Sequence, residues 1–245
     1  SRRCILMANN MINTNTLFGF DDNPIPSLES APTTTPVEEN VDPLYSYVNN
    51  TEAWKKKYLH PNVLTGEWEL ITDDYGDEIH HWKMFTPGFC KAVIDEAERQ
   101  NKWTTDRHQY YPTHDVPLKD LGLYEIYDSV LREYGFPIAS KLWRLEGKSW
   151  DKHMTHETFI IKYTPSSDNQ THLNIHHDQA DYTIHITLSD NFTGGGTWFP
   201  RQNKLVKGSV GSSVLFPNVT HPHGTRPTLS GERYCLISFC SRGPN

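Results

Sequence analysis

The sequence predicts an α+β protein with a double-stranded β-helix, or jelly roll, and helices packed on one side. Two amphipathic helical patterns come first, within residues 89–134. From about residue 156 the hydrophobic period changes, and short β-rich runs follow one another, separated by Gly, Pro, Asn and Asp. Many short strands at close spacing are typical of sandwiches and jelly rolls.

The N-terminal fifth is predicted to be an accessory segment, residues 1–43, ahead of one domain, residues 44–245. Cys4–Phe20 suggests a short strand and turn, and 21–43 (DDNPIPSLESAPTTTPVEENVDP) is a linker rich in Pro and Thr. The pattern of Ala53–Leu59 is compatible with a helix.

Two segments combine helical spacing of apolar residues with boundary signals. Phe89–Gln100 follows Pro87-Gly88, a start signal, and is predicted to be an amphipathic helix. Leu123–Tyr134 repeats the pattern, and Gly135-Phe136-Pro137 predicts its end. Six later runs are predicted to be strands: Glu157–Tyr163, Leu173–His177, Tyr182–Leu188, Thr197–Phe199, Ser213–Phe216 and Arg233–Phe239.

Composition narrows the class of function. The chain has 245 residues, 23 Lys and Arg against 30 Asp and Glu, and a net charge of −7 without a basic cluster, which argues against a nucleic-acid partner. No stretch approaches the apolar length of a transmembrane helix. The unusual count is 13 His, more than packing needs, and His is a common metal ligand.

One cluster of these histidines has the spacing of a metal site. If His176 and Asp178 lie in one strand they share a face, whereas His177 points away. A later His would complete two imidazoles and one carboxylate, the facial set that holds non-haem Fe(II) in oxygenases. His221 and His223 compete for this position, and the ten-residue spacing to Arg233 favours His223.

Arg233 has a chemical reason to accompany such a site. A planar guanidinium pairs in bidentate fashion with a carboxylate, so it would anchor the far end of a dicarboxylate such as 2-oxoglutarate. Glycines 194–196 are interpreted as a tight turn rather than a phosphate cradle, because no P-loop Lys follows.

Longer segments resemble a known family. HHDQADYTIHITLSDNFTGGGTWFPRQ and GSSVLFPNVTHPHGTRPTLSGERYCLISF are similar to the C-terminal catalytic domain of procollagen lysyl hydroxylases, which are Fe(II)- and 2-oxoglutarate-dependent dioxygenases. HWKMFTPGFCKAVIDEAERQNKW and YYPTHDVPLKDLGL extend the likeness, which runs from about residue 44 to the end.

The resemblance implies roles for particular residues. His185 stands where the family has Asn, and Thr197 where Cys is common. The catalytic and binding set that it implies is His176, Asp178 and His223 as iron ligands, Arg233 as the 2-oxoglutarate anchor, and Tyr163 and His185 as cosubstrate contacts.

The resemblance also implies an activity: hydroxylation of C5 of lysyl residues in collagen-like Gly-X-Lys sequences, with release of succinate and CO₂. Fe(II), 2-oxoglutarate, O₂ and ascorbate would take part, in a homodimer of the endoplasmic reticulum or another secretory compartment. A prolyl or other peptidyl hydroxylase, and a non-catalytic jelly-roll binding module, remain as alternatives.

Two further hypotheses concern residues outside this set. Asp181 or Glu157 would pair with the substrate's ammonium group. Spare histidines leave room for a second metal at an interface: His153, His156, His172 and His221.

Overall fold

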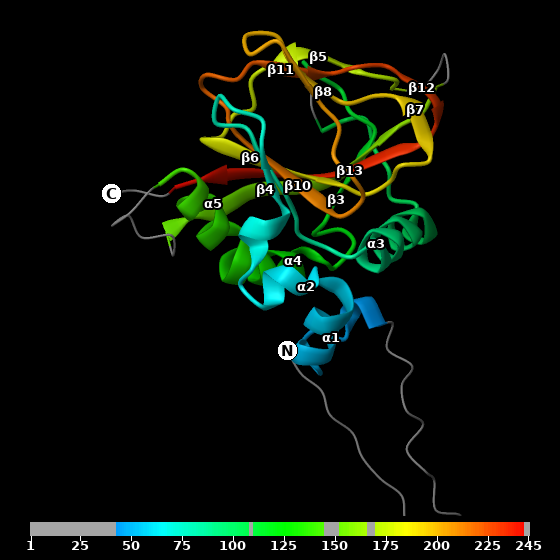
Figure 1. Ribbon diagram of the computed structural model, residues 1–245. Helices are drawn as coiled ribbons and strands as arrows, with labels where there is room; N and C mark the ends of the chain where they lie inside the picture. Colours follow the sequence, from blue (N-terminus) through cyan, green and yellow to red (C-terminus); the bar gives the residue numbers. More distant parts are fainter. Residues whose placement is uncertain (1–42, 108–109, 145–151, 166–169, 243–245) are drawn as a thin grey trace, which may run out of the picture. The chain divides into compact units, whose positions relative to one another are not determined.

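Two β-sheets form the central layers, and helices cover the outer face of the larger sheet (Figure 1). The computed structural model describes residues 43–107, 110–144, 152–165 and 170–242. The predicted jelly roll with helices on one side is confirmed. The predicted Cys4–Phe20 strand and the linker, apart from Pro43, lie outside the described residues.

All strand pairs within the sheets are antiparallel. The larger sheet has the order β1 (Thr72–Asp74), β2 (His80–Lys83), β10 (Ser212–Pro217), β6 (Tyr182–Thr187), β13 (Arg233–Ser241), β4 (Met154–Tyr163) and β3 (Asp115–Pro117). The smaller sheet has the order β5 (Leu173–His176), β11 (His223–Thr225), β8 (Thr197–Phe199) and β9 (Lys204–Val206). A separate two-stranded sheet pairs β12 (Thr228–Gly231) with β7 (Phe192–Gly194).

The six predicted strands correspond to β4, β5, β6, β8, β10 and β13. The strands that sequence reading missed have only three or four residues each: β1, β2, β3, β7, β9, β11 and β12. A run of this length is too short for a two-residue period to stand out from its surroundings. Their positions are decided by pairing with neighbouring strands.

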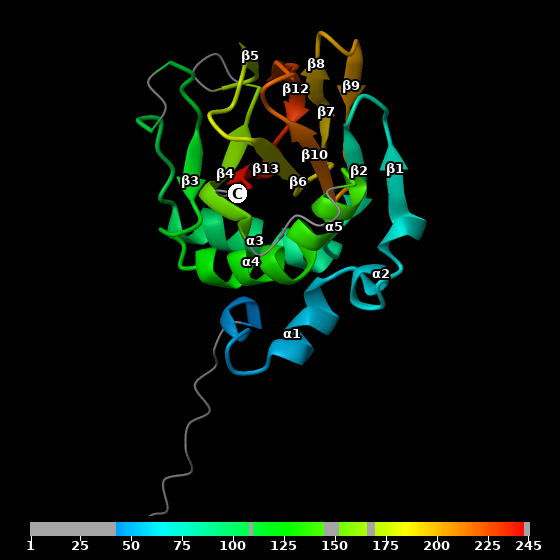
Figure 2. The same ribbon diagram turned by 90° about the vertical axis from the view of Figure 1, so that its left-hand side faces the viewer.

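The helical elements are η1 (Pro43–Tyr45), α1 (Thr51–Tyr58), α2 (Pro61–Leu64), η2 (Trp68–Ile71), α3 (Pro87–Gln100), α4 (Tyr124–Val130), η3 (Leu131–Gly135) and α5 (Phe136–Leu142). Figure 2 shows α3, α4 and α5 together along one face of the larger sheet. The predicted helices in 53–59 and 89–100 are confirmed. No described helix is long and apolar enough to cross a membrane.

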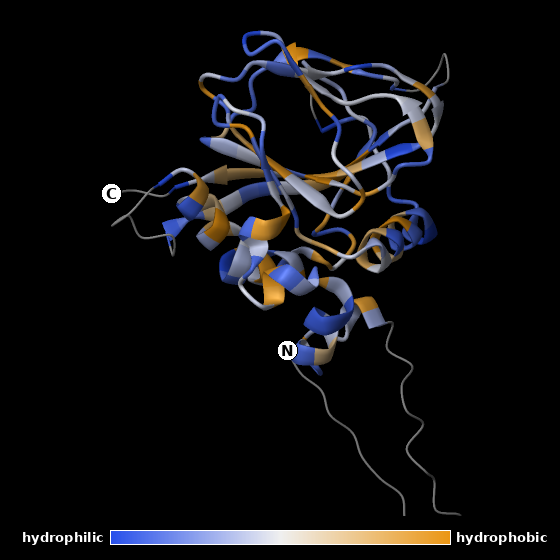
Figure 3. Cartoon of the chain, viewed as in Figure 1, coloured by the Kyte–Doolittle hydropathy of each residue, from blue (hydrophilic) through white to orange (hydrophobic). Residues whose placement is uncertain are grey.

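The α3 helix follows directly from its local sequence. The Thr86 side chain accepts a hydrogen bond from the backbone N–H of Phe89, Pro87 occupies the first turn, and Asn101 ends the helix in the left-handed conformation. Its buried side, which includes Val93 and Ala97, contributes to the core beneath the sheet, and Figure 3 shows its hydrophobic and hydrophilic sides.

The predicted end of the second helix at Gly135-Phe136-Pro137 is wrong. The chain continues through a π-helical turn, η3, directly into α5, and Gly135 keeps a helical φ of −64°. The Phe136 N–H donates to the Leu131 carbonyl, five residues back. This wide turn accommodates Pro137, which lacks an N–H and would disrupt a regular α-helical ladder.

Phe136 stabilises this junction, because its side chain is fully buried beneath the sheet. We expect Phe136→Ala to lower the free energy of unfolding by about 3–5 kcal/mol, since it leaves a cavity in the core. Urea unfolding followed by tryptophan fluorescence measures the change. Leu70→Ala, at a position 77% exposed, is the control and is expected to change stability little. Equal effects of the two variants would contradict the expectation.

Candidate active site

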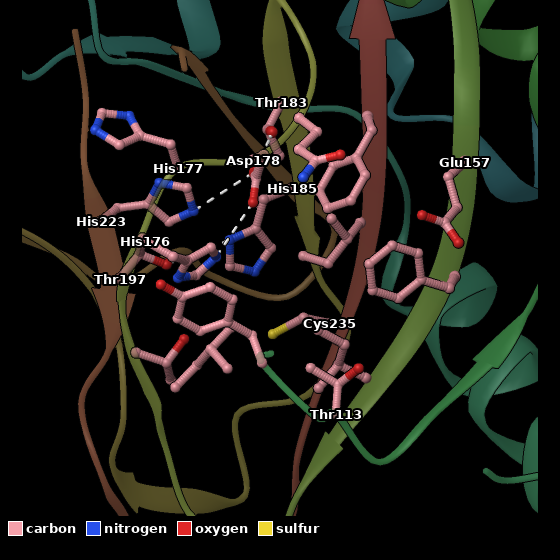
Figure 4. A pocket seen from close by; sticks show the side chains of 18 of the residues that line it. Thr113, Glu157, His176, His177, Asp178, Thr183, His185, Thr197, His223 and Cys235 are labelled. Atoms are coloured by element: carbon pink, nitrogen blue, oxygen red, sulfur yellow. Dashed lines mark hydrogen bonds and ion pairs between the residues drawn. The ribbon is translucent and has the colours of Figure 1, made fainter. Parts of the chain in front are cut away.

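Three side chains converge at one end of the smaller sheet. His176 ends β5, Asp178 follows two residues later, and His223 begins β11, where it is paired opposite His176. His176 Nε2 lies 3.2 Å from Asp178 Oδ1, and His223 Nε2 lies 3.5 Å from Asp178 Oδ2 (Figure 4). The three ligand atoms lie within 4.8 Å of one another.

His176 and Asp178 do not converge because they lie on one face of a single strand, as the sequence predicts. Since β5 ends at His176, Asp178 lies in the following loop rather than in the strand. Its carboxylate is positioned by the Thr183 hydroxyl of β6, which donates to Oδ2 at 2.5 Å. His177 does turn away, and its Nδ1–H donates to the Asn218 carbonyl at 2.7 Å.

The structure brings His223, and not His221, to Asp178. The His221 Nε2–H donates to the Asp77 carbonyl at 2.6 Å, and its Nδ1 accepts from the Thr220 hydroxyl at 2.8 Å. Both nitrogens of His221 are therefore occupied elsewhere. Among the side chains that the structure describes, no other group of three His, Cys, Asp or Glu comes as close together, so the spare histidines do not assemble a second such group.

The two imidazoles are held in the tautomer that a metal requires. The Nδ1–H of His176 donates to the Asn174 carbonyl at 2.7 Å, and that of His223 donates to the His221 carbonyl at 3.1 Å. Each Nε2 therefore presents a lone pair toward the shared point. Two such nitrogens and a carboxylate fit a divalent transition metal.

Charges in the group favour an ionised Asp178. Burial by itself would raise its pKa, but His223, His176 and the Thr183 hydroxyl together hold the pKa below its ordinary value. Burial lowers the pKa of His223, so that imidazole is neutral near pH 7. His176 has a raised pKa: burial opposes this, but the Asp178 carboxylate outweighs it. The carboxylate thus supplies the negative charge of the donor set.

The donor set lies in a cavity of about 690 Å³ between the sheets. Strand alternation decides what lines it, because residues of one strand point alternately to opposite faces. In β6, Ile184 and Ile186 contribute to the core beneath the sheet, whereas Thr183 and His185 line the cavity. The other residues that the sequence singled out, Tyr163 and Arg233, line the same cavity.

Arg233 is a buried cation that forms no ion pair with another described residue. It is 3% exposed, and its Nη1 has no hydrogen-bond partner within the described part of the chain. Its guanidinium carbon lies 5.1 Å from the centre of the Tyr163 ring. Gly195, at φ +61°, leaves the space that this arrangement needs, because a Cβ there would lie 3.0 Å from Arg233 Cδ. A buried, unpaired guanidinium favours binding of an anionic ligand.

Two neutral groups flank this cation. Tyr163 is opposite Arg233 in the β4–β13 register, and burial raises its pKa to about 12. The pKa of His185 is far below its usual value because of burial and the nearby Arg233 charge. The Nδ1 of His185 lies 3.4 Å from the Thr197 hydroxyl, and its buried Nε2 has no partner among the described residues. His185 can therefore bond to a ligand in the cavity.

Sequence reading missed part of this site. Thr183 has a polar side chain at an alternate position of the predicted strand that contains His185, so the polar alternation of that strand was the available signal. Arg107 and Asp115 also line or adjoin the cavity and form an ion pair. These two residues lie close to Glu157 because β3 pairs with β4. The local sequence does not show that these two strands pair.

Thr183→Val tests the support of Asp178. The isosteric change removes the hydroxyl that donates to the carboxylate, and we expect affinity for a divalent metal to fall by about 10–100-fold. Titration with Co²⁺, followed by its absorption spectrum, measures the affinity. Thr193→Val removes an exposed hydroxyl on β7 and is the control. Unchanged Co²⁺ affinity in Thr183→Val would show that the hydroxyl does not support the site.

Comparison with known proteins finds relatives in sequence and in fold. No protein-family model matches the sequence. The procollagen lysyl hydroxylase and glycosyltransferase of Acanthamoeba polyphaga mimivirus is 31% identical over 214 residues, 80% of this chain and 23% of the viral protein. Over this stretch the chain is similar in sequence to procollagen lysyl hydroxylases. Procollagen-lysine,2-oxoglutarate 5-dioxygenase 1 of Gallus gallus is 28% identical over 80% of this chain and 28% of its own length.

The chain spans about a quarter of the length of these relatives. Solved structures show its fold. The viral collagen prolyl hydroxylase of Paramecium bursaria Chlorella virus-1, in a 2-oxoglutarate complex, matches with a TM-score of 0.50 and 17% identity over 67% of this chain and 96% of that chain. A Pseudomonas putida prolyl-4-hydroxylase matches with a TM-score of 0.50 and 14% identity over 68% and 94%. The chain shares its jelly-roll fold with these two prolyl hydroxylases.

Proposed function

We propose that this chain is a peptidyl hydroxylase dependent on Fe(II) and 2-oxoglutarate, with lysyl C5 in collagen-like peptides as its target, and that residues 44–245 form the catalytic domain. The observation that carries the proposal is one cavity that contains both the His-Asp-His donor set and a buried guanidinium that has no ion-pair partner among the described residues. The names of the relatives support the lysyl substrate and the collagen-like partner.

Under this proposal His176, Asp178 and His223 hold the metal through the donor atoms described above. Iron, when bound, supplies the activation of O₂ that couples decarboxylation of 2-oxoglutarate to hydroxylation. The chain contributes a fixed tautomer at both imidazoles and an ionised carboxylate, so the donor set is arranged before binding. Ascorbate as reductant and assembly as a homodimer belong to the same proposal.

The opposite end of the cavity would receive the cosubstrate. Arg233 would pair with the carboxylate of 2-oxoglutarate farthest from the metal, which satisfies its buried Nη1. Tyr163 would contact the same carboxylate through its hydroxyl, and the neutral His185 would contact the cosubstrate without repelling Arg233. These three side chains would orient the dicarboxylate along the cavity.

A turnover assay tests this function against its alternatives. We expect the protein with Fe(II), 2-oxoglutarate and ascorbate to release succinate and to add one oxygen to lysine in a Gly-X-Lys peptide, located by fragmentation in a mass spectrometer. Hydroxylated proline in a Gly-Pro peptide, with untouched lysine, would instead favour a prolyl hydroxylase. Metal binding without succinate release would favour a non-catalytic binding module.

A further inference from the structure

We infer that Glu157 is the carboxylate that binds the ammonium group of the substrate lysine and so selects lysine over uncharged residues. The inference rests on the proposed function and assigns a specificity-determining residue to it. Glu157 lies in β4 and lines the same cavity as the His-Asp-His group. Figure 4 shows its carboxylate across the cavity from Asp178.

Strand register places Glu157 level with the candidate metal centre. Thr183 of β6 is opposite Phe239 of β13, and Phe239 is opposite Glu157 of β4. Directly opposite residues point to the same face of a sheet, so these three form one row toward the cavity. Thr183 is the residue that donates to Asp178. Glu157 therefore lies two strand spacings, about 10 Å, from Thr183.

The two ends of the cavity carry different charged residues. Arg233 is opposite Tyr163, which lies six residues along β4 from Glu157, a separation of about 20 Å in an extended strand. An anionic cosubstrate is attracted to the Arg233 end, and a cationic substrate to the Glu157 end. Phe159 and Ile161 form an apolar wall between them. An aliphatic stem with a charged tip, as in lysine, matches an apolar wall that ends in a carboxylate.

The neighbours of Glu157 leave it available to a second cation. Arg107 forms ion pairs with both Glu157 and Asp115, and its guanidinium carbon lies 4.7 Å from the centre of the Phe159 ring. The single Arg107 guanidinium is thus shared between two carboxylates. The Asp115 side chain is completely buried, whereas the Glu157 side chain is 38% exposed. Asp115 and Arg107 thus position Glu157, and Glu157 faces the substrate.

The other acidic residue that the sequence suggested for this role lies elsewhere. Asp181 is not among the residues that line the cavity, and its Oδ2 accepts a hydrogen bond from the backbone N–H of Arg242 at 2.9 Å. Asp181→Asn is therefore a matched control for Glu157→Gln, because each change removes one negative charge and keeps the shape of the side chain.

The test compares a Gly-X-Lys peptide with the same peptide carrying norleucine, which has the lysine stem without its amine. For the unaltered protein we expect kcat/KM to favour lysine. Glu157→Gln is expected to reduce kcat/KM for the lysyl peptide by about 10- to 100-fold, the value of one charge-assisted hydrogen bond, and to leave the norleucine peptide unchanged. The affinity of fluorescein-labelled peptides, measured by anisotropy, is expected to follow the same pattern, and Asp181→Asn to keep the lysine preference.

The failure of the proposed lysyl activity can be distinguished from the failure of the role of Glu157. If the unaltered protein leaves lysine untouched, the proposed lysyl activity and the role of Glu157 both fail. If it hydroxylates lysine and Glu157→Gln keeps the full preference over norleucine, only the role of Glu157 fails. Glu157→Asp keeps the charge on a shorter stem and is expected to retain part of the preference. If Glu157→Gln reduces turnover of both peptides equally, Glu157 stabilises the fold and does not bind the ammonium group, and the inference fails.

Discussion

Asp178→Ala is expected to abolish Fe(II)-dependent succinate release. Asp178 is the only carboxylate of the donor set found among the described residues, and both imidazole Nε2 atoms face its two oxygens. Without it, two neutral imidazoles remain to hold the ion. Loss of a hydrogen-bond partner behind a metal ligand costs about 10–100-fold in affinity, and we expect loss of the ligand itself to cost more. Calorimetric titration with Fe(II) under anaerobic conditions measures the affinity directly.

Asp178→Asn separates the charge of this ligand from its shape. The amide keeps the size of the side chain and one oxygen, so we expect metal binding between that of the unaltered protein and that of Asp178→Ala. His177→Ala is the control, since His177 is turned toward Asn218 and away from the donor set. Fe(II) affinity and succinate release that survive in Asp178→Ala would contradict the assignment of this residue.

Arg233→Met is expected to raise the KM for 2-oxoglutarate and to reduce kcat/KM by about 10²- to 10⁴-fold. A bidentate guanidinium–carboxylate pair contains two hydrogen bonds to charged groups, each worth about 1.5–3 kcal/mol. The methionine side chain fills a similar volume beside the Tyr163 ring but cannot pair with an anion. Arg233→Lys keeps the charge and loses the planar fork, so an intermediate loss is expected. Succinate release at a series of 2-oxoglutarate concentrations measures the effect.

A 2-oxo monocarboxylic acid provides the substrate control for Arg233. This compound lacks the distal carboxylate, so the unaltered protein and Arg233→Met are expected to use it equally poorly. Arg201→Met, at an exposed position, is the protein control and is expected to leave the KM unchanged. An unchanged KM for 2-oxoglutarate in Arg233→Met would show that another group binds the distal carboxylate.

Most of the fold could be predicted because its larger elements carry strong local patterns. The six predicted strands are β-rich runs bounded by turn residues, the helix over 89–100 has clear periodicity, and the structure has these elements at nearly the predicted bounds. The second helix shows where local rules fail. Gly135 and Pro137 are end signals in isolation, yet burial of Phe136 beneath the sheet keeps the chain helical through a π turn. Tertiary packing outweighed local propensity at this junction.

The sequence by itself determined which residue types could form the site. The spacing of His176, Asp178, His223 and Arg233 was enough to suggest a metal and an anion anchor, because ligand chemistry restricts the possible side chains. Only the tertiary structure decided how they meet. Asp178 is oriented by Thr183 from another strand, His221 is held by Asp77, and Glu157 is brought level with the donor set by register across β6, β13 and β4. The physical reason is that hydrogen bonding between strands joins residues far apart in the chain, and local periodicity carries no information about which strands pair.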